Sequence, residues 1–189
     1  MPWVKTGPVY QLKITLRDFR PPIWRRVLVP GHYTLADLHW VIQFAMGWTN
    51  SHLHHFQVGE TYYSLPMRGT DWEELGEKDS SNVRLDAIAP DAKMKFMYEY
   101  DFGDSWEHDV LVEKILPPDP KMKSPACLAG KGACPPEDVG GVWGYAEFLQ
   151  AIKDPEHPEH DEYLEWVGDE FDPKAFDLEV VNKALKKLR

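Results

Sequence analysis

The sequence predicts an α+β fold, namely a largely antiparallel sheet with one early helix and a helical C-terminal third packed on it. Two observations lead to this prediction. Apolar and polar residues alternate along much of the first two-thirds of the chain, as in strands with one buried face, and in the last third apolar residues recur at helical spacing. The 189 residues and their 43% hydrophobic content fit one core, so we expect residues 1–189 to form a single domain.

Two strands are predicted near the N-terminus. Residues 10–17 alternate apolar with polar side chains, and residues 23–29 form a second β-rich run that ends at the turn residues Pro30-Gly31. Since Pro21 and Pro22 interrupt the chain between these runs, we expect the two strands to form a hairpin or a near-hairpin.

The early helix follows this pair. Thr34 and Asp37 have the spacing of a capping box with Asp in place of Glu, and apolar residues then recur every three or four positions as far as Gly47. Residues 53–63 indicate two short strands around Gly59-Glu60. Residues 66–92 have no sustained period, so we expect a loop there, with one short strand near residues 83–85.

A central hairpin is predicted from residues 95–102 and 106–115, with residues 103–105 as its loop. A three-residue loop places Trp106, His108, Val110 and Val112 on the same face as the aromatic residues of the first strand, so that these side chains are buried. On this register His108 lies opposite Tyr100. The other face then carries two like-charge pairs, formed by Asp101 with Glu107 and by Glu99 with Asp109.

The rest of the chain is Pro/Gly-rich up to Gly141 and helical beyond it. One helix is expected around residues 145–152, ending at Asp154-Pro155, and a second between Pro158 and Gly168. The last helix is expected to begin at Asp172-Pro173 or at Asp177.

Composition indicates the cellular location and the class of binding partner. No apolar stretch is long enough to cross a bilayer and the first residues lack a signal peptide's apolar region, so we expect a cytoplasmic protein without a membrane partner. The two cysteines cannot supply a disulfide framework. A net charge of −10 argues against nucleic acid, because such binders neutralise phosphates with Lys and Arg. The expected partner is therefore a protein or a small molecule.

Several polar residues are candidates for a site. The like-charge pairs of the hairpin indicate either a solvated face or a site for a cation or a basic partner, to which Asp104 at the loop tip would contribute. His108 is either a general base or a core histidine, so Asp104 and His108 are the catalytic candidates. Glycine and proline around Glu137-Asp138 allow a rigid bend, which either binds a donor or caps a helix. The ligand-binding candidates are Asp101, Asp104, Trp106, His108, Glu137 and Asp138.

A metal site is a further alternative. His52 and His54 share the parity of a strand, and with Cys127 and Cys134 they would complete a His/Cys set of the zinc type. The cysteines are separated by six residues, however, which is not the tight C-x2-C knuckle of strong zinc motifs. We therefore expect no cofactor, with zinc or another divalent metal as the alternative.

Five motifs in order resemble the plasmid pRiA4b ORF-3-like family. They are Pro22-Ile23-Trp24-Arg25-Arg26, Met46-Gly47-Trp48, Ser51-His52-Leu53-His54, the stretch from Tyr100 to His108, and the stretch from Pro135 to Gly141. The resemblance implies an α+β fold and an occurrence on plasmids, mobile elements and chromosomes of microbes. Some members carry the label transposon resolvase, which the acidic charge of this chain fits poorly. The family supplies no catalytic residues to transfer.

These observations favour a cytoplasmic binding or adaptor domain. Its ligand-facing region would combine residues 101–108, 52–55 and 135–141, because function usually lies in loops held by a rigid scaffold. One alternative is a metal-assisted hydrolase that uses His52, His54, Asp104 and His108. Another is a DNA-processing accessory protein of a mobile element.

Overall fold

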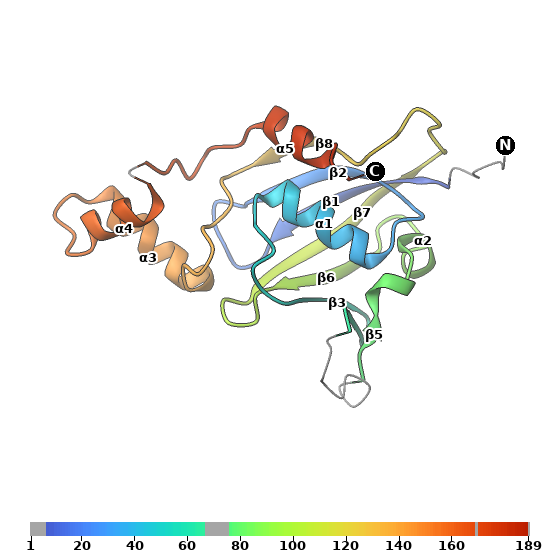
Figure 1. Ribbon diagram of the computed structural model, residues 1–189, viewed down its shortest axis with the longest axis horizontal. Helices are drawn as coiled ribbons and strands as arrows, with labels where there is room; N and C mark the ends of the chain where they lie inside the picture. Colours follow the sequence, from blue (N-terminus) through green and yellow to red (C-terminus); the bar gives the residue numbers. More distant parts are fainter. Residues whose placement is uncertain (1–6, 67–75, 169, 189) are drawn as a thin grey trace.

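The computed structural model describes residues 7–66, 76–168 and 170–188, and its centre is an eight-stranded sheet (Figure 1). The strand order is β5-β4-β3-β6-β7-β1-β2-β8, and every neighbouring pair is antiparallel except β4 and β5. The prediction of an α+β fold with a largely antiparallel sheet is therefore confirmed. The strands are β1 Val9–Leu16, β2 Trp24–Pro30, β3 His54–Val58, β4 Thr61–Ser64, β5 Lys78–Asp79, β6 Lys95–Tyr100, β7 Trp106–Leu116 and β8 Ala126–Lys131.

The prediction of a helical C-terminal third packed on the sheet is confirmed only in part. α5 lies against α1 and the edge strand β8, whereas α3 packs against α4 and this pair extends beyond the end of the sheet (Figure 1). The described residues form five α-helices, which are α1 Leu35–Met46, α2 Leu85–Ile88, α3 Gly141–Lys153, α4 His160–Val167 and α5 Leu178–Leu185.

Helix α1 covers one face of the sheet and begins and ends where the sequence predicts (Figure 1). The Thr34 hydroxyl accepts a hydrogen bond from the Asp37 backbone N–H at 3.1 Å, and the Asp37 carboxylate accepts from the Thr34 backbone N–H at 2.8 Å. Gly47 ends the helix in the left-handed conformation, which glycine adopts without steric cost. The buried side of α1, including Leu38 and Ile42, contributes to the core.

The two faces of the sheet differ in polarity. Leu12 and Ile14 of β1 are fully buried in the core beneath α1. The opposite face carries paired charges, since Arg17 contacts Glu107 at 2.8 Å and Asp109 at 2.7 Å. Lys95 also reaches Asp109, and Arg26 pairs with Glu113. This arrangement is typical of an antiparallel sheet with one solvated face.

The central hairpin forms, but its register differs from the predicted one. Tyr100 pairs with Trp106 and Tyr98 with His108, so the loop has five residues rather than three. A shift of two positions preserves parity, and Trp106 and His108 are accordingly buried as predicted. The predicted opposition of His108 to Tyr100 is wrong. The shift arises because Asp101 and Ser105 both adopt positive φ, at 59° and 54°, and leave the strands early.

The predicted cross-strand charge pairs change with this register. Glu99 lies opposite Glu107, and Asp109 lies opposite Met97, so the pairs Asp101–Glu107 and Glu99–Asp109 are wrong. The carboxylates on this face have partners: Arg17 for Glu107 and Asp109, and the Ser105 hydroxyl for Glu99 at 2.7 Å. On this side of the hairpin the carboxylates therefore interact with neighbouring side chains of the protein.

Two further expectations need correction. The strand expected near residues 83–85 is wrong, because only Arg84 forms an isolated bridge and α2 begins at Leu85. Part of the loop expected over residues 66–92, namely 67–75, lies outside the described residues.

Strand β8 falls within the segment that the sequence presents as Pro/Gly-rich, and it pairs with β2. Its sequence, Ala-Cys-Leu-Ala-Gly-Lys, lacks the β-branched residues that mark a strand. Of the two starts considered for the last helix, Asp177 is the one observed.

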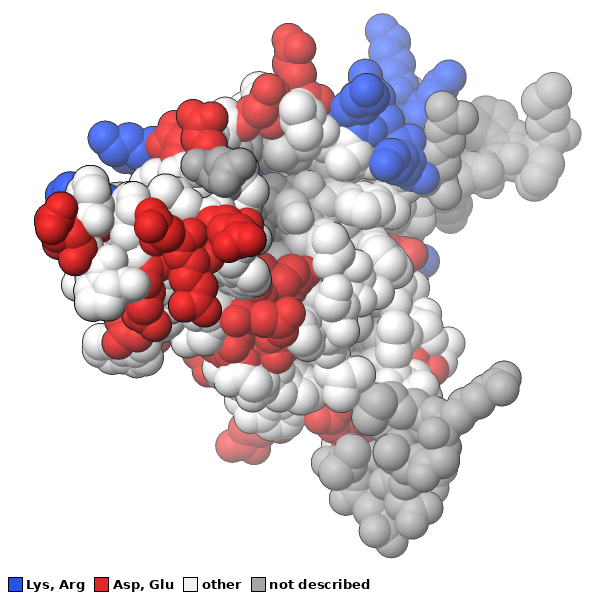
Figure 2. Space-filling model, turned by 60° about the vertical axis from the view of Figure 1, so that its left-hand side comes forward, with Lys and Arg blue, Asp and Glu red and all other residues white. Residues whose placement is uncertain are grey.

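The net negative charge is concentrated in one segment. Residues 154–172, here called the acidic arm, contain nine of the 31 acidic residues of the chain and none of its 21 basic residues. Almost all of the net charge of −10 therefore comes from this segment, which includes α4. Figure 2 shows acidic side chains gathered on the face that comes forward with α3 and α4. In the part of the chain that the structure describes, no helix is both long and apolar enough to cross a membrane.

Three buried histidines pack in the core beside Tyr98. The rings of His39 and His54 stack with their centroids 3.5 Å apart, and His39 also contacts the Tyr98 hydroxyl and Asn50, each at 2.8 Å. Burial lowers the pKa of His39 to about 4 and that of His54 to about 3, and it lowers the pKa of the fully enclosed His108 to about 4. All three imidazoles are therefore neutral at pH 7.

Acid should destabilise this core. Between about pH 6.5, the ordinary histidine value, and pH 4, the unfolded chain binds protons that the folded chain excludes, so the free energy of unfolding falls as pH falls. Urea unfolding at pH 7.5, 6 and 5 measures this slope. We expect His54→Phe, which keeps the ring stack, to reduce the slope by about one proton. The exposed His32 serves as the control, since His32→Gln should leave the slope unchanged. Stability that does not vary over this range would contradict the assignment.

Candidate functional site

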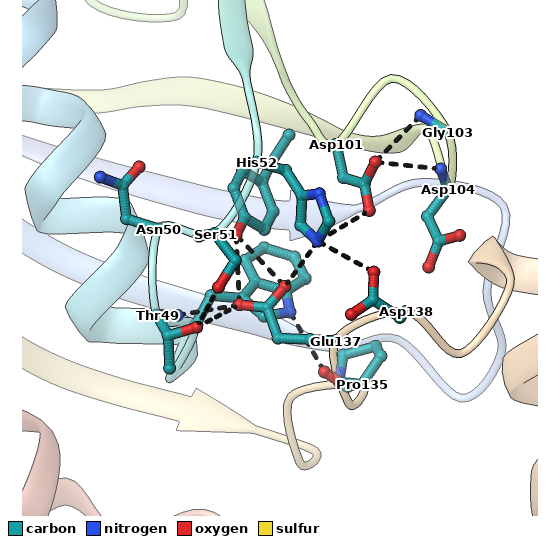
Figure 3. A network of polar contacts seen from close by, with 12 residues as sticks. Thr49, Asn50, Ser51, His52, Asp101, Gly103, Asp104, Pro135, Glu137 and Asp138 are labelled. Atoms are coloured by element: carbon teal, nitrogen blue, oxygen red, sulfur yellow. Dashed lines mark hydrogen bonds and ion pairs between the residues drawn. The ribbon is translucent and has the colours of Figure 1, made fainter.

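Three segments that are distant in sequence meet beside the end of β6 (Figure 3). They are residues 49–52, which follow α1, the hairpin loop 101–105, and the turn 135–141 before α3. We call this place the three-loop junction. Five of the candidates from the sequence lie within it: His52, Asp101, Asp104, Glu137 and Asp138.

The hairpin loop is organised by Asp101. Its backbone N–H donates to the carbonyl of Leu53 at 2.8 Å, and one carboxylate oxygen, Oδ1, accepts from the backbone N–H groups of Gly103 and Asp104 at 2.9 and 3.4 Å. An Asp side chain that bonds to the backbone two residues later is a common way to close a turn. The second oxygen, Oδ2, is thereby left facing His52.

The tip of the hairpin docks on the turn 135–141. Asp104 Oδ2 accepts a hydrogen bond from the Gly140 N–H at 3.1 Å. A Cβ atom on Gly141 would lie 2.4 Å from the Asp104 carbonyl oxygen, and Gly141 has a φ of 69°, so this position requires glycine. Trp48 adds a contact on the same turn by donating its Nε1–H to the Pro135 carbonyl at 3.1 Å.

Glu137 is fixed by hydroxyl and amide donors. Its Oε1 accepts from the Thr49 N–H at 2.9 Å, from the Thr49 hydroxyl at 3.0 Å and from the Tyr100 hydroxyl at 3.1 Å. Burial, with a further contribution from Glu137, raises the pKa of Tyr100 to about 12. The Tyr100 hydroxyl therefore keeps its proton for Glu137 while accepting from the Ser51 N–H at 2.8 Å.

His52 lies at the centre of the acidic side chains (Figure 3). Its Nε2 is 3.0 Å from Asp138 Oδ1, 3.5 Å from Asp101 Oδ2 and 4.0 Å from Glu137 Oε2. We call these four residues the His52 cluster. Among the described residues, the group of His, Cys, Asp or Glu that could hold a metal ion is His52, Asp101 and Asp138, whose ligand atoms all lie within 4.8 Å of one another.

A cleft of about 550 Å³ opens beside the junction. His52 belongs both to the cluster and to the wall of this cleft, which Ser51, His54 and the exposed side chains of Leu53 and Phe102 also line. Glu77 lines the cleft as well, whereas Asp101, Glu137 and Asp138 do not.

The other candidates from the sequence lie elsewhere. Trp106 and His108 are enclosed in the core, and His54 stacks on His39. Cys127 is buried on β8, where its N–H donates to Asn182, and Cys134 lies against Gly47, where burial raises the pKa of its thiol. Hence the His/Cys set proposed for zinc does not assemble. The set proposed for a hydrolase is divided too, since His54 and His108 belong to the core.

Some residues of the junction are not among the candidates identified from the sequence. Thr49, Ser51 and Tyr100 hold Glu137 or one another, yet none was among the candidates. The run Thr49-Asn50-Ser51 directly after the helix terminus was the available signal, because hydroxyl and amide side chains gather where backbone donors need partners.

The fold and the junction together define an α+β protein whose candidate site, an acidic cluster around one histidine, is built from loops beside a largely antiparallel sheet. The chain belongs to the plasmid pRiA4b ORF-3-like family, whose model matches residues 8–180. The resemblance noted from the sequence is thereby confirmed.

Two relatives span nearly the whole chain. An uncharacterized protein, y4hQ, from Sinorhizobium fredii strain NGR234 is 43% identical over 182 residues, which cover 95% of this chain and 92% of that protein. The crystal structure of MM3350, a protein of unknown function from Methanosarcina mazei Go1, is similar with a TM-score of 0.81 and 39% identity. That match covers 92% of this chain and 98% of the other.

The contact between Asp104 and Gly141 predicts a large effect of one methyl group. Gly141→Ala should lower the free energy of unfolding by about 2–4 kcal/mol, because it adds a steric clash to the cost of a left-handed alanine. Gly59→Ala is the matched control: Gly59 has a φ of 60° but open space around its Cβ position, so only the backbone term of about 1 kcal/mol applies. Urea unfolding of both variants measures the difference. Equal losses would show that the hairpin tip does not dock on the turn.

Proposed function

We propose that this protein is a binding domain that recognises a positively charged ligand at the three-loop junction. The observation that supports the proposal is the convergence of His52 with Asp101, Glu137 and Asp138. The ion pairs that Lys and Arg form among the described residues involve other carboxylates, on the solvated face of the sheet and at Asp86. The carboxylates of Asp101, Glu137 and Asp138 thus share a single imidazole as their nearest cationic group.

Two of these carboxylates are largely buried. The side chains of Asp101 and Glu137 are only 10% and 21% exposed, so solvent screens their mutual repulsion less than it would on an open surface. A ligand that brings positive charge relieves this repulsion. An anionic ligand would increase it, which makes the junction selective by charge.

The junction is also held in place before any ligand arrives. Asp101 Oδ1 and Glu137 Oε1 accept hydrogen bonds from the protein, and the Tyr100 hydroxyl also reaches Glu137 Oε2 at 3.2 Å. Asp101 Oδ2 and Glu137 Oε2 are the oxygens that face His52. Side chains fixed in this way lose little entropy on binding. The exposed Leu53 and Phe102 along the neighbouring cleft would suit an apolar part of the ligand.

The proposal includes a cytoplasmic setting, which the free cysteines Cys127 and Cys134 support. It does not assign catalysis, because a binding role requires only the charge and shape of the junction. The family resemblance also implies an association with mobile elements, and the proposed binding role does not depend on it.

Thermal unfolding in the presence of charged probes tests this function. Spermidine, arginine amide and Mn²⁺ provide three kinds of cation, and glutamate provides an anion. We expect at least one cation to raise the Tm and glutamate to leave it unchanged, since binding at 100 times Kd adds about 2.7 kcal/mol to the free energy of unfolding. In Asp101→Asn this increase should disappear, although Asn keeps an oxygen for the Gly103 N–H and tolerates the left-handed backbone.

Asp18→Asn is the matched control. Asp18 also has a positive φ, at 56°, is exposed, and lies outside the His52 cluster, so its replacement removes one charge without touching the junction. The cation-induced increase in Tm should survive in this variant. If no cation raises the Tm of the natural chain, or if Asp101→Asn retains the full increase, the junction is not a cation-binding site.

A further inference from the structure

We propose that the His52 cluster binds one divalent transition-metal ion, of the Mn²⁺ or Zn²⁺ type. The ligands would be His52 Nε2, Asp101 Oδ2 and Asp138 Oδ1, with Glu137 Oε2 close enough to become a fourth (Figure 3). This inference rests on the proposed function and specifies its ligand, because a divalent metal ion brings the most positive charge per unit volume of the cations considered.

The spacing of the donor atoms fits a metal ion. Metal–ligand bonds of about 2.1 Å place neighbouring ligand atoms roughly 3.0–3.4 Å apart in octahedral or tetrahedral geometry. His52 Nε2 lies 3.0 Å from Asp138 Oδ1 and 3.5 Å from Asp101 Oδ2. The Asp101 and Asp138 oxygens lie within 4.8 Å of each other, so side-chain movement would be needed to bring the three ligand atoms around one ion. The 4.0 Å between His52 Nε2 and Glu137 Oε2 requires a further movement if Glu137 is to join them.

The imidazole nitrogen gives a second, independent indication. His52 Nε2 is enclosed by protein atoms, yet it makes no hydrogen bond of good geometry with any described residue. Asp138 Oδ1 is near enough at 3.0 Å, so the direction of the contact and not its length is what fails. A buried polar nitrogen without a hydrogen bond is costly. A cation between the imidazole and the carboxylates would satisfy it.

The carboxylate of Asp101 leads to the same conclusion. Its side chain is nine-tenths buried, and the hydrogen bonds from the Gly103 and Asp104 N–H groups are both accepted by Oδ1. Among the described residues, the one contact recorded for Oδ2 is His52 at 3.5 Å, which is too long for a hydrogen bond. This oxygen is thus directed at the same point as His52 Nε2 (Figure 3).

Neighbouring groups orient the ligands as the outer contacts of a metal site do. Gly103 N–H fixes Asp101, and Thr49 together with Tyr100 fixes Glu137. Such outer hydrogen bonds hold ligands in position and tune their affinity for the ion. Asp138 is the exception, because its side chain is 69% exposed and would close the site from the solvent side.

The donor set selects the class of ion. Carboxylate oxygens suit Mg²⁺, Ca²⁺ and Mn²⁺, whereas an imidazole nitrogen suits Zn²⁺, Fe²⁺ and other transition ions. One nitrogen with two or three carboxylates therefore favours Mn²⁺ or Zn²⁺ over Mg²⁺ or Ca²⁺. Cu⁺ is disfavoured because the site contains no sulfur ligand. Since His52 also lines the cleft, the ion would lie beside the space available to an organic ligand.

The competing explanation is an ordinary ion pair, in which a protonated His52 is held by Asp138 and Asp101. The two explanations differ in what the site binds. An ion pair needs no metal and is weakened by one, because the proton and the metal compete for Nε2.

Titration of metal-free protein with Mn²⁺, followed by electron paramagnetic resonance, tests the site directly. We expect one bound Mn²⁺ per chain, and calorimetry should find one Zn²⁺ that competes with it. Asp101→Asn and Asp138→Asn should each weaken binding more than about tenfold. Both native residues have positive φ, at 59° and 58°, which asparagine accommodates, so both variants should fold.

The spectrum of bound Mn²⁺ supplies a readout that a purely structural role would not change. Pulsed measurements should detect coupling to one imidazole nitrogen in the natural chain, and His52→Gln should remove it. Asp18→Asn, the control outside the cluster, should bind Mn²⁺ as the natural chain does.

Two results separate this inference from the proposed function. If spermidine or arginine amide stabilises the protein through Asp101 but neither Mn²⁺ nor Zn²⁺ binds, the metal site is overturned and the binding domain stands. If none of these cations binds, both proposals fall. Stoichiometric Mn²⁺ binding that is unchanged in Asp101→Asn would also overturn this metal site, because the ion would then lie elsewhere.

Discussion

The contact between the hairpin tip and the turn before α3 is the constraint on which the site depends. Asp101 turns the chain out of β6 with a left-handed residue, and the carbonyl of Asp104 then meets Gly141 so closely that no side chain fits between them. This contact brings two segments, separated by more than thirty positions, to the place where His52 follows α1. The acidic side chains are close together because the backbones are.

Much of the fold could be predicted because its signals are local. The capping box at Thr34 and the glycine at position 47 predict α1, and alternation predicts β1 and β6. Parity survived even where the register did not, since a shift of two residues keeps Trp106 and His108 buried. Strand β8 was missed because its pairing with β2, and not its own composition, makes it a strand.

The sequence indicates which loops form the candidate site, but not which of the candidate residues come together in it. Polar motifs in three loops indicated where to look, and five of the candidates do meet. The pairing of His52 with His54 failed because His52 precedes β3, where the alternation of a strand does not yet hold, whereas His54 belongs to β3 and turns into the core. Likewise, nothing in the spacing of Cys127 and Cys134 reveals that one lies on an edge strand and the other against α1.

The acidic arm has a consequence for the molecule as a whole. Because residues 154–172 hold nearly all of the net charge and α3 with α4 extends past the sheet, the protein has a strong permanent dipole rather than an evenly charged surface. Near a charged interface it would rotate before it is attracted or repelled, turning the arm away from an anionic surface and toward a cationic one. Retention on an anion-exchange resin would therefore report on the arm and hardly on the three-loop junction.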